Sequence, residues 1–187
     1  MTRFIVCTLL SIMSTYSFDT AVTQIRVHNN IDNVTQATRE QTDMHGSSLL
    51  HYAISYQKHQ IADYLLQNGL SPNYFNNDGF TPFHVAIRNS DTTGTHLLLT
   101  YKASLHTADP SGDLPMHYVV HMNNSKLINA ISHHYHSAVD MPQCIENTRD
   151  YETPLHRGIQ TNSIQAIQTL LDNDANTDIL DHNNRTF

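Results

Sequence analysis

Histidine is the residue most able to do chemistry in this chain, which holds fourteen of them among 187 residues. His117 and His121 stand four residues apart, a spacing that places two imidazoles on one face of a helix. His133, His134 and His136 follow shortly after. Neutral imidazole is the commonest metal ligand in proteins, and it titrates near physiological pH. These histidines are therefore the one candidate cluster for metal-dependent or pH-sensitive behaviour.

Cys7 and Cys144 are the only cysteines. Neither has a partner at Cys-x-x-Cys spacing, which excludes a zinc ribbon and a disulfide-rich scaffold. The histidines form no His-Glu-x-x-His motif and have no acidic residue at ligand spacing. We therefore expect no metal and no cofactor. The alternative is a metal- or redox-responsive periplasmic protein that uses the histidine cluster and Cys144.

Motifs for catalysis are missing as well. The sequence has no Gly-x-Ser-x-Gly elbow, no P-loop and no glycine fingerprint for dinucleotides. Cys144 beside a histidine could serve as a nucleophile, but an exposed cysteine without an activating environment is inert or becomes oxidised. We predict no catalytic residue and no enzymatic activity.

The composition is that of a folded, acidic chain. Hydrophobic residues make up 39% of it and charged residues 14%, which is too apolar for a disordered protein. The formal net charge is −7, and the 10 lysines and arginines form no basic stripe that could neutralise phosphates. We predict one folded domain that does not bind nucleic acid.

Residues 1–17 differ from the rest of the chain. Arg3 precedes an apolar run of ten residues from Phe4 to Met13, and the small residues Thr15 and Ser17 follow. This order is typical of a secretory signal peptide, and ten residues are too few to span a bilayer. A buried first helix is the alternative. We predict a signal peptide and no stable membrane span, hence a secreted or periplasmic protein; without the signal, the location would be the cytoplasm.

A short motif recurs along the chain at a nearly constant period. It appears as SSLLH ending at His51, FTPFH at His84, DLPMH at His117 and ETPLH at His156. Successive motif histidines lie 33, 33 and 39 residues apart, and Thr186 stands where the next motif threonine is due. A fixed period of this length is the signature of a repeat architecture.

Other residues keep the same phase. Gly46, Gly79 and Gly112 lie five residues before the motif histidine, where a tight turn needs a positive φ. Asp43 and Asp109 lie eight residues before it. A pair of leucines recurs as Leu65-Leu66, Leu98-Leu99 and Leu170-Leu171.

This Thr-Pro-Leu-His motif with its 33-residue period resembles the ankyrin-repeat family over residues 18–187. The resemblance implies an all-α fold, an ankyrin-repeat solenoid of stacked helix-turn-helix units with short hairpin or finger loops. A capping Thr before a first-turn Pro places helix starts near Pro82 and Pro154, and Leu114 marks the equivalent start in repeat 3. In the family, the motif histidine hydrogen-bonds the threonine hydroxyl and nearby backbone. The implied function is protein–protein interaction, as an adaptor, a scaffold, or a secreted bacterial protein or effector.

The period sets the expected boundaries. They are the signal peptide 1–17, a degenerate N-terminal capping repeat 18–42, repeat 1 at 43–75, repeat 2 at 76–108, repeat 3 at 109–147, repeat 4 at 148–180, and the start of a truncated fifth repeat at 181–187. Six extra residues in repeat 3 are expected in a loop near 139–149. Tyr151 replaces the turn glycine, so that turn should adopt another geometry. Gly94 weakens its helix by about 1 kcal/mol, and we expect the second helix of repeat 2 to be the least regular.

Family members bind partners on the concave side, through the fingertips and the exposed face of each first helix. Carried over position by position, the resemblance implies partner-binding roles for Met44, His45, Ser47, Ser55, Tyr56, Asn77, Asp78, Phe80, Arg88, Asn89, Pro110, Ser111, Asp113, His121, Met122, Arg149, Asp150, Glu152, Gln160 and Thr161. Several are of types enriched in protein interfaces. The expected partner is another protein.

The last full repeat has apolar residues that need covering. Ile164, Ile167, Leu170 and Leu171 fall at helical spacing and should face repeat 3 on one side and a fifth repeat on the other. Only the first residues of that fifth repeat are present, so we expect either a fragment of a longer protein or a face covered by a partner or a second copy. Self-association through this C-terminal end is a further expectation.

Signal-peptide cleavage predicts a shorter chain in the native source. We expect removal of residues 1–17, because the charge, the apolar run and the small residues occur in the order that signal peptidase requires. Intact-mass analysis of protein from its source measures this directly. A mass that retains Met1 to Thr20 would contradict the signal-peptide interpretation.

Overall fold

The computed structural model describes residues 18–28, 41–144, 151–180 and 186. The predicted signal peptide, the second half of the predicted capping repeat, Arg149, Asp150 and most of the predicted fifth-repeat start lie outside these residues. The chain divides into two compact units, one up to Val85 and one from Ala86. Helix α5 (Pro82–Arg88) crosses that boundary.

Both units are built from helices. The first unit holds a helical segment 18–28 that ends in the π-helical turn η1 (Gln24–His28), then α3 (Leu49–Ser55) and α4 (His59–Gln67). The second unit holds α6 (Thr92–Thr100), α7 (Pro115–His121), α8 (Ser125–His134), the 3₁₀ helix η2 (His136–Asp140), β1 (Gln143–Cys144), β2 (Tyr151–Glu152), α9 (Pro154–Gln160) and α10 (Ile164–Asp172). Strands β1 and β2 form one short antiparallel pair.

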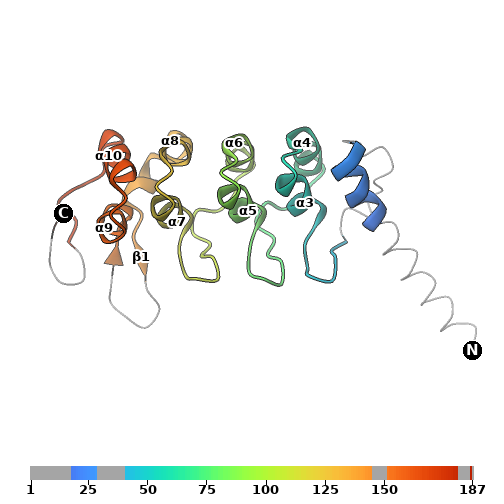
Figure 1. The fold of residues 1–187 in the computed structure, drawn as a ribbon, viewed down its shortest axis with the longest axis horizontal. Helices are drawn as coiled ribbons and strands as arrows, with labels where there is room; N and C mark the ends of the chain where they lie inside the picture. The colour runs from blue at the N-terminus through green and yellow to red at the C-terminus, as the bar shows by residue number, and fades with distance from the viewer. Residues whose placement is uncertain (1–17, 29–40, 145–150, 181–185, 187) are drawn as a thin grey trace, which may run out of the picture. The chain divides into compact units, whose positions relative to one another are not determined.

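Each sequence motif opens a pair of helices. The first helix of a pair has seven residues, and the second has nine or ten. The predicted starts near Pro82, Leu114 and Pro154 are confirmed to within one residue. Figure 1 shows the two helices of each pair lying beside each other, as in α3 with α4 and α9 with α10.

The side chains buried in each repeat are the apolar ones that recur with the repeat period. In the first unit Leu50, Ile54 and Leu65 are fully buried between the helices. Phe18 and Ile25 from the N-terminal helical segment are also buried, and η1 packs on α3. This segment therefore covers the apolar surface of repeat 1, as a capping element does in a repeat array.

A left-handed residue joins the two helices of every repeat. Gln57, Ser90, Asn123 and Asn162 each lie six residues after a motif histidine, and each has φ between 52° and 54°. A residue in this conformation ends a helix and reverses the chain in very few residues. None of the four is a glycine, so the residue types alone did not reveal the position.

The insertion in repeat 3 begins earlier than the sequence indicated. Eighteen residues after the motif histidine, Gly69, Lys102 and Asp174 have φ of 89°, 65° and 60°. The equivalent Tyr135 has φ −141°, and η2 follows it at once. The chain thus departs from the other repeats at Tyr135, because an extended tyrosine replaces the left-handed residue that returns the chain there; residues 145–149 of the loop expected near 139–149 lie outside the described residues.

Tyr151 adopts the different geometry that was expected. It lies in strand β2 and pairs with Cys144 in β1, so its backbone is extended rather than left-handed. An extended backbone has room for a bulky side chain, whereas a positive φ does not. The six extra residues of repeat 3 provide the chain length for a pair of short strands in place of the glycine turn.

The expectation that Gly94 makes its helix irregular is wrong. Helix α6 has nine residues, the same number as α4 and α10. The buried Asp91 caps α6, and its Oδ1 accepts a hydrogen bond from Gly94 N at 2.9 Å. A Cβ at position 94 would lie 2.3 Å from the other oxygen of Asp91. The glycine makes room for the cap, and the cap compensates for the weak helix propensity.

The motif histidines cap the first helices as the family resemblance implies. His84 Nδ1 accepts from Thr81 N at 3.1 Å and lies 2.9 Å from the threonine hydroxyl. His156 makes the same two contacts with Thr153, at 3.4 and 2.8 Å. In repeat 3, Leu114 occupies the threonine position, and Nδ1 of the buried His117 has no partner among the described residues. An unsatisfied buried polar atom lowers stability.

Leu114→Thr should therefore stabilise the protein. Leu114 already has the extended backbone of a cap, with φ −69° and ψ 154°, so a hydroxyl placed there can reach His117 Nδ1. We expect a gain of about 1 kcal/mol in the free energy of unfolding, measured by urea denaturation. Leu114→Val is the matched control, because valine shortens the side chain without adding a donor. An equal effect of both substitutions would show that the hydrogen bond is not the cause.

Candidate functional site

The finger turns are shaped by a side-chain oxygen at their first residue. In the first finger, Asp43 Oδ1 accepts from His45 N at 2.9 Å and from Ser47 N at 2.7 Å. In the second finger, Asn76 Oδ1 accepts from Phe80 N at 2.9 Å. Asn76 stands eight residues before its motif histidine, the position that aspartate holds in other repeats. Sequence reasoning missed it because only aspartate was sought there.

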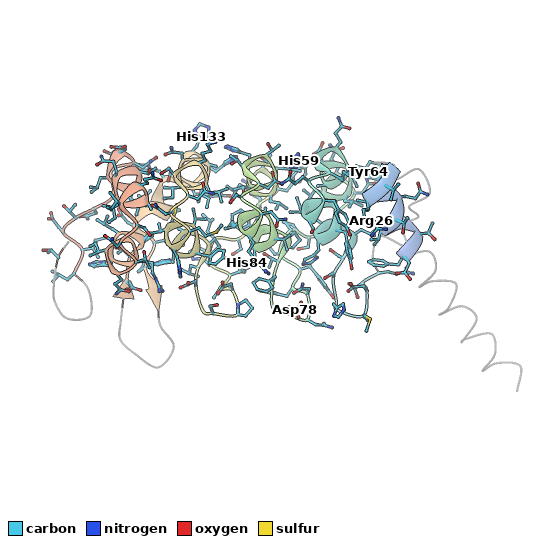
Figure 2. The ribbon with its side chains drawn as sticks, viewed as in Figure 1. Arg26, His59, Tyr64, Asp78, His84 and His133 are labelled. Atoms are coloured by element: carbon cyan, nitrogen blue, oxygen red, sulfur yellow. The ribbon has the colours of Figure 1, made fainter. Side chains whose placement is uncertain are left out.

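The two fingers of the first unit are bonded to each other. Asn77 N donates to His45 O at 2.8 Å, and Asn77 Nδ2 donates to Met44 O at 3.2 Å. Gly46 has φ 70°, and a Cβ there would lie 2.5 Å from Asn77 Oδ1. The glycine thus allows both the turn and the close approach of the second finger. Figure 2 shows Asp78 on this second finger and His84 on helix α5, which follows the finger.

Tyr52 fastens the first finger to helix α3. Its hydroxyl donates to Asp43 Oδ2 at 2.6 Å. Its ring stacks on Tyr56 and meets Phe18 edge-on, with ring centroids 6.1 and 6.2 Å away. Burial, followed by the hydrogen bond to Asp43 and its negative charge, raises the pKa of Tyr52. The tyrosine therefore stays protonated and donating, although sequence reasoning did not single it out.

His51 fastens the second finger to the same helix. Its Nδ1 accepts from Ser48 N at 3.1 Å, so the ring proton is on Nε2, which donates to Phe80 O at 3.1 Å. Burial lowers the pKa of His51, although the Phe80 carbonyl and the charge of Asp43 oppose the shift. The neutral ring can then accept at one nitrogen and donate at the other.

The predicted partner-binding residues differ in their exposure. Those exposed are Met44, His45, Ser55, Asn77, Asp78, Arg88, Asn89, Pro110, Ser111, His121 and Gln160. Those half-buried are Ser47, Tyr56, Phe80, Met122 and Thr161. Asp113 and Glu152 are buried.

The two buried residues take part in a network inside the second unit. Arg157 Nη2 contacts Asp113 Oδ1 at 2.7 Å and Glu152 Oε2 at 3.4 Å. Gln160 donates to the other oxygen of Glu152. His117 Nε2 donates to Glu152 O at 2.8 Å, and burial, with the Arg157 charge adding to it, lowers the pKa of His117 to about 4. Asp113 and Glu152 thus position the finger of repeat 3 and the start of α9 rather than present charge to solvent.

The histidines assemble differently from the predicted cluster. His134 on α8 lies against His96 on α6, with 2.9 Å between His134 Nε2 and His96 Nδ1. The predicted member His133 lies near both rings, so His96 takes the place that the sequence prediction gave to His136. His96 stands 38 residues before His134, and no spacing rule connects them. Across the described residues, no three histidine, cysteine, aspartate or glutamate side chains converge as a ready-made metal cage.

The helices that the structure describes are all too short or too polar to cross a membrane.

Comparison with known proteins identifies relatives of this chain. Residues 50–99 match the family described as ankyrin repeats (many copies). Ankyrin repeat protein FPV031 of Fowlpox virus (strain NVSL) is 33% identical over 107 residues, which cover 54% of this chain and 31% of the relative. Ankyrin repeat protein L371 of Acanthamoeba polyphaga mimivirus is 30% identical over 110 residues, which cover 58% of this chain and 14% of the relative.

The chain thus spans less than a third of the length of either of these relatives. Residues 50–99 include nearly all of helices α3, α4, α5 and α6, together with the second finger. The chain therefore contains ankyrin repeats, and its described helix pairs are the helix-turn-helix units of that all-α solenoid.

Proposed function

We propose that this protein binds another protein through the paired fingertips of its first unit. The observation that carries the proposal is the bonding of Asn77 to His45 and Met44, which fixes two adjacent fingers as one surface. Met44 lies at the tip of the first finger and is 86% exposed, although methionine is a residue that folding usually buries. An exposed large apolar side chain on a rigid turn is typical of an interaction site.

The chemistry of this surface indicates the kind of partner. Met44 offers a flexible apolar contact, and Phe80 lies half-buried beneath the second finger. Asp78 and Asn77 are exposed beside them, and the chain carries a net charge of −7. These residues favour a protein segment with an apolar anchor and a neighbouring basic or hydrogen-bond-donating group. The proposal gives the chain the role of an adaptor or scaffold and no catalytic role.

The place of action follows from the N-terminal sequence alone. The arginine, apolar run and small residues of 1–17 support export, which would make this a secreted protein or effector. Without export, the same fingertips would bind a cytoplasmic partner.

Substitution at the fingertips should weaken binding without unfolding the protein. We expect Met44→Ala with Asp78→Ala to reduce retention of the specific partner at least tenfold, because central interface residues each contribute about 1–2 kcal/mol or more. Quantitative affinity capture from source cells, with thermal melts of each variant, measures this. The matched control is Gln67→Ala with Lys126→Ala, exposed residues on the second helices α4 and α8. Loss of partner in the control but not in the fingertip variant would contradict the proposal.

We also propose that the C-terminal face of repeat 4 mediates self-association. Ile159 is 46% exposed, whereas Ile54, Ile87 and Val120, at the same position in the other repeats, are fully buried. Ile164 beside it is 68% exposed. The buried His156 Nε2 has no partner among the described residues, whereas His117 Nε2 in repeat 3 bonds a carbonyl of the following repeat. This face can therefore accept an apolar surface together with a hydrogen-bond acceptor.

Polar substitution on this face should reduce self-association. We expect the wild-type mass from light scattering to rise with concentration, and Ile159→Gln with Ile164→Gln to remain closer to a monomer, because covering each isoleucine is worth about 1 kcal/mol or more. Val27→Gln removes an apolar side chain of similar exposure at the other end of the chain and should leave the association unchanged. A wild-type protein that stays monomeric at all concentrations would exclude this face as a self-association site.

A further inference from the structure

Two imidazole nitrogens face each other on the side of the second unit that carries α6 and α8. His96 Nδ1 and His134 Nε2 are 2.9 Å apart, and their ring centroids are 5.0 Å apart. The ring of His133 stands 6.4 Å from that of His96 and 5.9 Å from that of His134. Three histidines therefore meet at one edge. In Figure 2, His133 lies at the end of α8, at the opposite edge of the unit from the strands.

We propose that His96 and His134 form a binding site for a divalent transition-metal ion of the copper or nickel class. The site joins two successive repeats, since α6 belongs to repeat 2 and α8 to repeat 3. It lies apart from the fingertips and does not depend on the proposed function.

The distance between the two nitrogens suits this class of ion. With metal–nitrogen bonds of about 2.0–2.1 Å, two nitrogens 2.9 Å apart subtend an angle of about 90° at the metal. That angle is the one between neighbouring ligands in the square or tetragonal geometry of Cu(II) and Ni(II). Tetrahedral zinc would need the nitrogens to move apart. The two side chains can thus hold the preferred ions with little movement, and water would fill the remaining positions.

The protonation of the pair is compatible with metal binding. A neutral imidazole carries one ring proton and one free nitrogen lone pair, so the contact between the facing nitrogens needs only one proton. A neutral pair shares one proton between the facing nitrogens. When a metal ion binds, that proton leaves for solvent, and the same ring takes up a proton at its other nitrogen. For a pair of neutral rings the exchange releases no net proton.

The surroundings favour a cation. His133 and His134 end helix α8, whose ten residues direct the negative end of their dipole toward this edge. His96 and His134 are half-buried, while the ring of His133 is exposed. His133 is thus placed to contribute a third nitrogen after a side-chain rotation.

Metal titration of the purified chain tests the proposal. With Cu²⁺ or Ni²⁺ at pH 7.5, we expect saturable binding of one ion per chain by isothermal titration calorimetry, with nitrogen hyperfine structure in the copper resonance spectrum. Replacing His96 or His134 by Ala should weaken this binding by more than the roughly tenfold loss that follows removal of an outer-shell partner. His96→Asn and His134→Asn serve as second variants, because they keep a polar side chain if an alanine variant fails to fold.

Two matched controls separate this site from the other histidines. His136→Ala alters the first residue of η2, two positions after His134, and His121→Ala alters the exposed last residue of α7. Both should leave the affinity and stoichiometry unchanged. The proposal is overturned if the wild-type chain shows no saturable uptake, if the double variant of His96 and His134 binds as tightly as wild type, or if binding is lost in His136→Ala instead.

Discussion

A hydrogen bond from a buried imidazole to the next repeat sets the geometry on which the rest of the structure depends. His51 Nε2 donates to Phe80 O, and His117 Nε2 donates to Glu152 O, each just before the cap of the following helix pair. Burial lowers the pKa of both rings, and a neutral ring can donate at Nε2 while Nδ1 faces its own cap. His51 thus fixes a helix start and the position of the next finger together, whereas His117, whose Nδ1 has no partner among the described residues, fixes the next finger alone.

The same constraint accounts for how repeat 3 tolerates its insertion. The histidine and its carbonyl partner are 29 residues apart for His51 and 35 for His117, yet both bonds form. The backbone departs from the conformation of the other repeats at Tyr135, forms η2 and the β1–β2 pair, and reaches the equivalent finger position again at Glu152. Chain length between anchored points can vary because a longer loop costs little additional entropy.

Fixing the fingers also separates the residues that can bind from those that hold the fold. In the first unit the backbone N–H and the side-chain amide of Asn77 both donate to carbonyls of the first finger, which leaves the side chains of Met44 and Asp78 outside. In the second unit Arg157 draws Asp113 and Glu152 inward, so the finger residues four positions before the motif histidine serve packing there. The paired histidines His96 and His134 lie on the second helices, where a ligand would not compete with a partner at the fingertips.

The sequence by itself determined the repeat and the helix starts, because a constant period repeats the same local contacts and so exposes them as a pattern, while the family resemblance implied the capping role of the motif histidines. Tertiary structure alone decided that Gly94 serves the Asp91 cap, that Glu152 is buried, and that His96 meets His134. These outcomes depend on which side chains of adjacent repeats face each other across the packed helices. Neighbours made by packing lie at separations that no local rule encodes, so no pattern along the chain could have shown them.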